Sequence, residues 1–127
     1  MLISDSHRFL FVHVQKTGGL TVERYLLDTL EDADRVGGLP GDRHATLTDA
    51  LEAHPELKDH YTFGFVRNPW ARLYSWHQMI LRRQKTAAEG NEYVQEKLRT
   101  NPFWQAVLRD YATFEEFVLR GSGDHER

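Results

Sequence analysis

Cysteine is absent from the chain. Without a thiol the protein forms no disulfide and no thiolate metal site, and nothing in the sequence indicates an oxidising compartment. Long apolar runs are also absent, because none approaches the ~20 residues that a helix needs to cross a bilayer. The first residues, Met1 to His7, lack the cationic start and apolar stretch of a signal peptide. These absences favour a soluble, cytoplasmic protein with no transmembrane segment.

An excess of basic residues is missing as well. The chain carries 16 Lys and Arg against 19 Asp and Glu, so its formal net charge is −3. A general nucleic-acid binder usually has a strong basic excess, and we therefore expect no nucleic-acid partner. A polyanion must instead be bound locally, by a few cations and backbone N–H groups. The length of 127 residues is that of one domain, which we expect over residues 1–127 with a loose tail at 121–127.

Two short apolar runs predict strands. Residues 9–14 read Phe-Leu-Phe-Val-His-Val, and residues 61–66 read Tyr-Thr-Phe-Gly-Phe-Val. The first run is continuous, which suits a strand that is buried on both faces of a parallel sheet. The second is aromatic and β-branched, which also predicts a strand. Helices are expected over about 20–30, 46–54, 69–85, 92–99, 103–109 and 114–119. The order of strands and helices predicts an α/β fold with a small parallel sheet and a helical C-terminal part.

Residues with a capping role mark two of these helix starts. Thr46 followed by Asp49 has the pattern of an N-cap with an acidic third residue, and Pro55 is expected to end that helix. Asn68 followed by Pro69 reads as an N-cap with proline at the first helical position.

A lysine-glycine loop joins the first strand to the first helix. It reads Lys-Thr-Gly-Gly-Leu-Thr over residues 16–21. Two glycines allow a tight turn, and the N–H groups and dipole at the helix start favour a bound phosphate. The Lys16 ammonium can reach the same anion, and Thr21 can add a hydroxyl. The nucleotide triphosphate P-loop does not match, since here the lysine precedes the glycines. A structural turn with a solvated lysine is the alternative interpretation.

A second segment follows the second strand. Arg67 lies at the exit of that strand, beside the predicted helix start, and arginine is suited to multidentate phosphate recognition. Ser75 lies about two turns into the helix and offers a hydroxyl. Alternatively, Arg67 pairs with a carboxylate and Ser75 packs.

Together, the two segments resemble the PAPS-dependent sulfotransferases, where PAPS is 3′-phosphoadenosine-5′-phosphosulfate. The closer resemblance is to the group of heparan sulfate 2-O-sulfotransferases and related bacterial proteins, over about residues 9–81. Residues 16–21 are similar to that family's Lys-Thr-(Gly/Ala)-(Gly/Ser)-Thr-Ser loop. Residues 66–75, Val-Arg-Asn-Pro-Trp-Ala-Arg-Leu-Tyr-Ser, are similar to its Val-Arg-Asn-Pro-Trp-x-Arg-Leu-x-Ser segment. The resemblance implies a P-loop NTPase-like three-layer fold and a sulfotransferase that uses PAPS and releases the bisphosphate PAP.

The resemblance also implies roles for individual residues in an in-line displacement at sulfur. Lys16 stabilises the charge on the bridging oxygen of the leaving group, and His44 is the general base that removes the proton of an acceptor hydroxyl. Arg67 and Ser75 hold the 3′-phosphate. The 5′-phosphate is held by the loop residues Thr17, Gly18, Gly19, Leu20 and Thr21. Leu20 stands where the family usually has a threonine that donates to the 5′-phosphate. Thr21 or the loop backbone is expected to replace that donor, and a lower donor affinity is the alternative.

The acceptor favoured by the resemblance is a carbohydrate hydroxyl; a small alcohol, a lipid or a tyrosine hydroxyl stays open. No metal is required, and no histidine pair has metal-ligand spacing. Because the family's domain is usually longer than this chain, a second hypothesis is a truncated or inactive PAPS- or PAP-binding module that a partner chain completes. Homo-oligomerisation is left open.

Several other residues receive structural interpretations. His13 and His77 are expected to pack in the core, and Trp70 and Trp76 to pack rather than to stack on a sugar. For Arg72, a local carboxylate partner and a supporting role at the 3′-phosphate both stay open. A basic group is expected to form a solvated helix end, with contact to an anionic glycan as the alternative: Arg82, Arg83 and Lys85.

Overall fold

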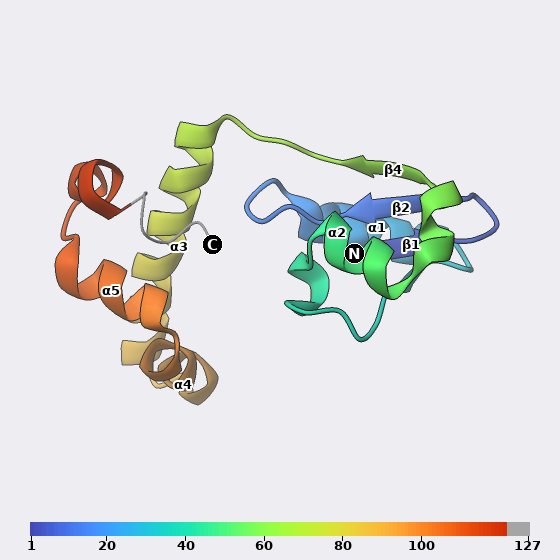
Figure 1. The fold of residues 1–127 in the computed structure, drawn as a ribbon. Helices are drawn as coiled ribbons and strands as arrows, with labels where there is room; N and C mark the ends of the chain where they lie inside the picture. The colour runs from blue at the N-terminus through green and yellow to red at the C-terminus, as the bar shows by residue number, and fades with distance from the viewer. Residues whose placement is uncertain (122–127) are drawn as a thin grey trace. The chain divides into compact units, whose positions relative to one another are not determined.

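The computed structural model describes residues 1–121 as an α/β protein with a small mixed sheet (Figure 1). The chain divides into two compact units, Met1–Arg67 and Asn68–Arg127, and each is described by itself. The single domain expected over residues 1–127 stays a prediction. Gly121, where the predicted tail begins, closes the last helical turn. Residues 122–127 of that predicted tail lie outside the described residues.

The first unit holds a four-stranded sheet in the order β3-β1-β2-β4. The two predicted strands are β2 (Phe9–Val12) and β4 (Tyr61–Gly64), and they are parallel neighbours as expected. The sheet as a whole is mixed rather than parallel, which corrects the prediction. Strand β1 (Leu2–Ser4) runs antiparallel to β2 and also to β3 (Asp34–Arg35). Both added strands are too short for a periodic pattern to reveal them.

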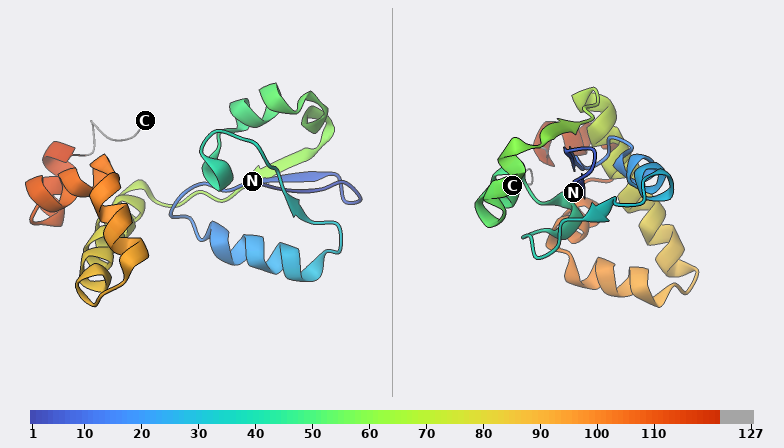
Figure 2. Two further views of the ribbon diagram at one scale, coloured as in Figure 1. Left: turned by 90° about the horizontal axis from the view of Figure 1, so that it is seen from below. Right: turned by 90° about the vertical axis from the view of Figure 1, so that its right-hand side faces the viewer.

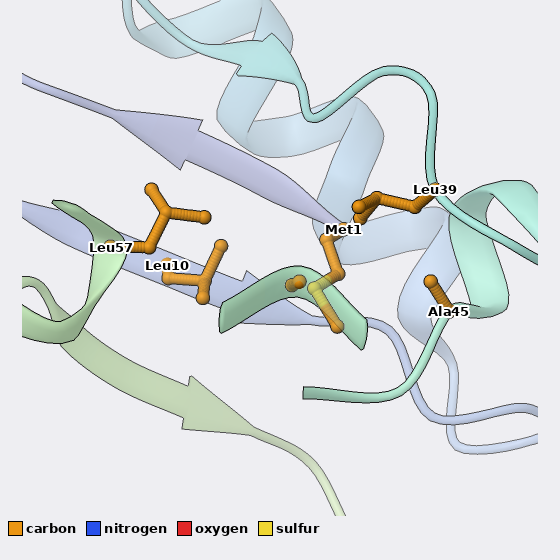
Figure 3. Packing of buried hydrophobic residues seen from close by; sticks show 6 residues of the cluster. Met1, Leu10, Leu39, Ala45 and Leu57 are labelled. Carbon is orange, nitrogen blue, oxygen red and sulfur yellow. The ribbon is translucent and has the colours of Figure 1, made fainter. Parts of the chain in front are cut away.

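Helices cover both faces of this sheet (Figure 2, left). Helix α1 (Gly19–Thr29) lies on one face, and α2 (Leu47–Ala53) lies on the other with the 3₁₀ helix η2 (Pro55–Asp59). Because side chains alternate along a strand, β2 sends Leu10 to the α2 face and Phe11 to the α1 face, and both are buried. The core on the α2 face consists of Met1, Leu10, Leu39, Ala45, Ala50 and Leu57 (Figure 3).

Helix α2 begins as the sequence predicted. The Thr46 hydroxyl accepts the Asp49 N–H at 3.1 Å, and the Asp49 carboxylate accepts the Thr46 N–H at 3.0 Å. The hydrogen bond with the Thr46 hydroxyl has the larger effect and that from the Thr46 N–H the smaller, and both lower the pKa of Asp49. This reciprocal capping fixes where the chain turns back over the sheet, and Pro55 starts the 3₁₀ helix that follows.

The second unit is helical. Its elements are α3 (Pro69–Ala88), α4 (Glu92–Thr100), α5 (Pro102–Asp110), α6 (Phe114–Glu116) and the π-helical turn η3 (Phe117–Gly121). Asn68 caps α3, because its side-chain oxygen accepts the Ala71 N–H at 3.2 Å. Ile80, Val107 and Phe117 form the centre of this unit's core.

His77 belongs to the same core, as predicted. It is 2% exposed, and its ring stacks on Phe117 with centroids 5.6 Å apart. Trp76 packs edge-on against Phe103 at 5.0 Å. The packing expected of Trp70 is wrong, because its side chain is 64% exposed. Of the basic residues near the end of α3, Arg83 lies over the Trp104 ring at 5.9 Å.

A hydrogen-bonded cluster joins β1 to the segment after α1. The Asp32 carboxylate accepts the Ser6 N–H at 2.8 Å and the buried Ser4 hydroxyl at 2.9 Å. Hydrogen bonds from these two donors lower the pKa of Asp32 from 3.8 to about 2, and the bond from the Ser6 N–H has the largest effect. The cluster therefore favours the ionised carboxylate in the folded state.

The stability of the first unit should depend on Asp32 in acid. Because the folded-state pKa is depressed, the stabilisation is present above pH 3.8 and is lost as the pH falls through about 2. In the parent, the urea midpoint of unfolding should fall as the pH is lowered over that window. Asp32→Asn should reduce this fall, whereas Asp28→Asn on α1 should leave it as large as in the parent. The three tryptophans all lie in the second unit. Tryptophan fluorescence would thus report on the second unit only. Unfolding of the first unit should therefore be followed by amide hydrogen exchange in β1 and β2. If the urea midpoint depended on pH equally in the parent and in Asp32→Asn, Asp32 would not be the group responsible.

Candidate anion site at the edge of the sheet

The two phosphate-binding segments predicted from the sequence leave the same edge of the sheet. Strands β2 and β4 are parallel and in register, with Phe9 opposite Tyr61 and Val12 opposite Gly64. The lysine-glycine loop follows β2, and Arg67 follows β4. The Arg67 guanidinium donates to the Lys16 carbonyl at 3.4 Å. Two segments that lie 51 residues apart in the chain therefore meet at one place in the first unit.

The loop has an unusual backbone. Lys16 has a positive φ of 65°, and Gly18, the N-cap of α1, has a φ of 87°. The Thr17 hydroxyl donates to the Val14 carbonyl at 2.8 Å, which ties the loop to the end of β2. No side chain caps the N-terminus of α1. Since the first N–H groups of a helix have no intrahelical acceptor, those of Gly19 and Leu20 are available to an anion.

A histidine ring lies directly against the start of α1. A Cβ on Gly19 would come within 2.8 Å of His13 Cγ, and closer still to two other ring atoms. Real Cβ atoms essentially never approach another heavy atom so closely, and only glycine fits at this position. His13 is 4% exposed, which confirms that it packs. Its ring thus supports the loop from inside the protein.

His44 lies beside this ring. It ends a short 3₁₀ turn, η1 (Asp42–His44), which begins after Gly41 in the left-handed conformation. The His44 ring meets the His13 ring edge to face at 4.7 Å, and its Nδ1 lies 3.4 Å from the His13 carbonyl oxygen. Partial burial lowers the pKa of His44; the nearby His13 and Arg43 side chains lower it further, and the His13 carbonyl opposes the shift. A lowered pKa keeps the ring uncharged at neutral pH, as a proton acceptor requires.

Among the predicted site residues, Arg67 meets the loop at Lys16, and His44 lies against His13, whose ring packs on Gly19. Leu20 points outward and is 59% exposed, and Thr21 is exposed beside it. The Thr21 N–H already donates to the Gly18 carbonyl at 3.0 Å. Ser75 lies on α3 in the second unit, and its role stays a prediction.

One residue of this region was missed by the sequence reasoning. Glu23 on α1 is buried, and its Oε1 accepts a hydrogen bond from His13 Nδ1 at 2.6 Å. Its position one turn after Gly19, on the same helix face, was the available signal. A glutamate on a helix is usually exposed, and the sequence does not show that this one is buried.

Within residues 1–121, no three His, Asp or Glu side chains are grouped so as to hold a metal ion. Over the same residues, no helix has the length and apolar character to cross a membrane.

Comparison with known proteins gives the family. A family model described as "Sulfotransferase family" matches residues 1–126, nearly the entire chain. The chain therefore belongs to the sulfotransferase family, as the two motifs predicted. Neither the curated proteins nor the solved structures gave a match.

Proposed function

We propose that the chain transfers a sulfuryl group from PAPS to a hydroxyl acceptor, and that its first unit is the P-loop-like donor-binding part. Membership of the sulfotransferase family supports sulfuryl transfer in general. The observation that carries the choice of donor is the approach of Arg67 to the lysine-glycine loop at the start of α1. PAPS has a phosphosulfate and a separate 3′-phosphate. The loop with Lys16 offers a cation to the first, and Arg67 offers one to the second.

The residues present fit an anionic donor. The uncapped start of α1 supplies N–H groups and the positive end of the helix dipole to the 5′-phosphate. Gly18 takes the left-handed conformation of the turn before α1, Gly19 leaves room for the His13 ring, and Thr17 holds the loop in place. Lys16 provides the charge that stabilises the departing bridging oxygen, and Arg67 binds the 3′-phosphate, a group that ATP lacks.

Proton removal is the task that we assign to His44. Its ring is uncharged at neutral pH because its pKa is lowered, and it can accept the proton of the acceptor hydroxyl as the new oxygen–sulfur bond forms. We propose a carbohydrate as the acceptor on the resemblance to the heparan sulfate group. The scheme uses no metal ion. The roles of Ser75 and Thr21, the cytoplasmic location and the oligomeric state stay predictions.

Calorimetric titration with PAP, and with ATP in parallel, tests donor binding. We expect PAP to bind and ATP not to bind. Arg67→Ala should weaken PAP binding by about 10- to 100-fold, because a hydrogen bond to a charged group contributes ~1.5–3 kcal/mol. Arg24→Ala, which removes an exposed guanidinium from α1, is the matched control and should bind as the parent does.

Two results would count against the proposal. An unchanged PAP dissociation constant in Arg67→Ala would refute the assignment of that residue. If a folded parent binds no PAP, the chain is not a complete donor site. The hypothesis of a module that needs a partner chain, with Leu20 replacing the family's threonine, would then be preferred.

A further inference from the structure

A buried carboxylate lies behind the lysine-glycine loop. Glu23 is 1% exposed, and its Oε1 is 2.6 Å from His13 Nδ1. Its Oε2 has no hydrogen-bond partner among the described residues. The nearest cation to that oxygen is the half-exposed Arg35, at 3.7 Å. A carboxylate removed from water is costly unless it is paired, and His13 is therefore the partner that accounts for the burial of Glu23.

The pair fixes the proton of His13 on one nitrogen. A carboxylate only accepts hydrogen bonds, so His13 Nδ1 carries the hydrogen. With that bond made, the imidazole cannot rotate without leaving Glu23 unpaired. The ring is also confined on a second side by Gly19, which leaves no room for it to shift toward α1.

The third neighbour of the His13 ring is His44. The two rings meet edge to face at 4.7 Å, and His44 Nδ1 faces the His13 carbonyl oxygen at 3.4 Å. A carbonyl oxygen also only accepts, so this contact requires the hydrogen of His44 on Nδ1. The lone pair of the neutral ring then resides on Nε2.

We infer that Glu23 is a positioning residue for His44. Glu23 holds the His13 ring, and the edge-to-face contact of that ring orients the His44 imidazole so that its Nδ1 faces the His13 carbonyl oxygen, which leaves Nε2 as the proton-accepting atom. This rests on the proposed function, in which His44 is the base. Glu23 and His13 act through His44 and are not themselves catalytic residues. A positioning role also accounts for a buried hydrogen-bonded polar pair at a position where two apolar side chains would pack as well.

The tautomer of His44 tests this inference without any assay of activity. The full chain, labelled with ¹⁵N-histidine, is examined at neutral pH by long-range ¹H–¹⁵N correlation, with His44 assigned from the spectrum of His44→Gln. The parent should show His44 as a single tautomer with the hydrogen on Nδ1. It should also show a strongly downfield His13 Nδ1 proton, as a 2.6 Å bond to a carboxylate requires.

Two substitutions of Glu23 separate positioning from packing. Glu23→Leu keeps a similar volume and removes the acceptor, so the downfield His13 signal should be lost and His44 should become a mixture of both tautomers. Glu23→Gln keeps an oxygen that can accept from His13 Nδ1, and should restore the single His44 tautomer. Glu52→Gln, on the exposed side of α2, should change neither signal.

Either of two results would overturn the inference. One is a parent spectrum with the His44 hydrogen on Nε2, which decides the question even if Glu23→Leu fails to fold. The other is a folded Glu23→Leu whose His44 signals match the parent. The PAP titration distinguishes these outcomes from failure of the proposed function, since donor binding is read there independently of His44.

Discussion

Lys16→Ala should lower the turnover of sulfuryl transfer by about 10²-fold or more, the scale seen on removal of one transition-state donor. The ammonium is assigned to charge that develops only as the bridging oxygen leaves. Its loss should therefore reduce kcat far more than it weakens PAP binding. The measurement is release of PAP from PAPS with a pool of hydroxyl acceptors, together with calorimetric binding of PAP.

Two further variants separate the charge of Lys16 from its backbone conformation. Lys16 has a φ of 65°, and asparagine tolerates that left-handed region better than other L-residues. Lys16→Asn should thus keep the loop conformation and lower turnover by the same factor as Lys16→Ala. Lys58→Ala removes an exposed ammonium from η2 and should retain parental turnover. Equal turnover in Lys16→Ala and the parent would rule out the assigned role.

Gly19→Ala should destabilise the first unit and disable the loop together. The new methyl group would overlap the His13 ring, which Glu23 holds from the other side. Overpacking of this kind usually costs ~1–3 kcal/mol, and here neither the ring nor the start of α1 can yield without breaking a contact. The unfolding free energy, followed by amide exchange in β2, should fall by that amount, and PAP affinity should fall with it.

Gly37→Ala is the matched control. A Cβ at Gly37 meets nothing within 4 Å, and a surface substitution of this kind usually changes stability by less than ~0.5 kcal/mol. If Gly19→Ala were as stable as Gly37→Ala, the close packing of His13 on the start of α1 would be disproved.

Local chemistry explains which features could be predicted from the sequence. The start of α2 depends on Thr46 and Asp49 alone, and that of α3 on Asn68 and Pro69, so each can be recognised within a few residues. Strands β2 and β4 are apolar enough to be recognised, although each is two residues shorter than predicted. The family resemblance assigned the loop and Arg67 to the same donor, but their contact is a result of the structure, in which the parallel strands β2 and β4 end at the same edge of the sheet.

Tertiary contacts explain what was missed. Strand β3 has two exposed residues and exists only because β1 offers it a partner, so its own residues carry no signal. Glu23 looks like an ordinary helix-surface residue until β2 places His13 against it. The role of His13 was likewise recognised only as packing, because its contacts come from Gly19, Glu23 and His44, which are separated in the chain.

The register between β2 and β4 restricts changes of chain length more than changes of residue type. Val12 lies opposite Gly64, and each residue of a strand advances the chain by ~3.3 Å and reverses the side to which the next side chain points. Deleting one residue from β2 would therefore move the lysine-glycine loop away from Arg67 and turn His13 to the opposite side of the sheet. The exposed Leu20 of the loop can be exchanged more freely, but the number of residues between the start of β2 and the loop is expected to stay fixed.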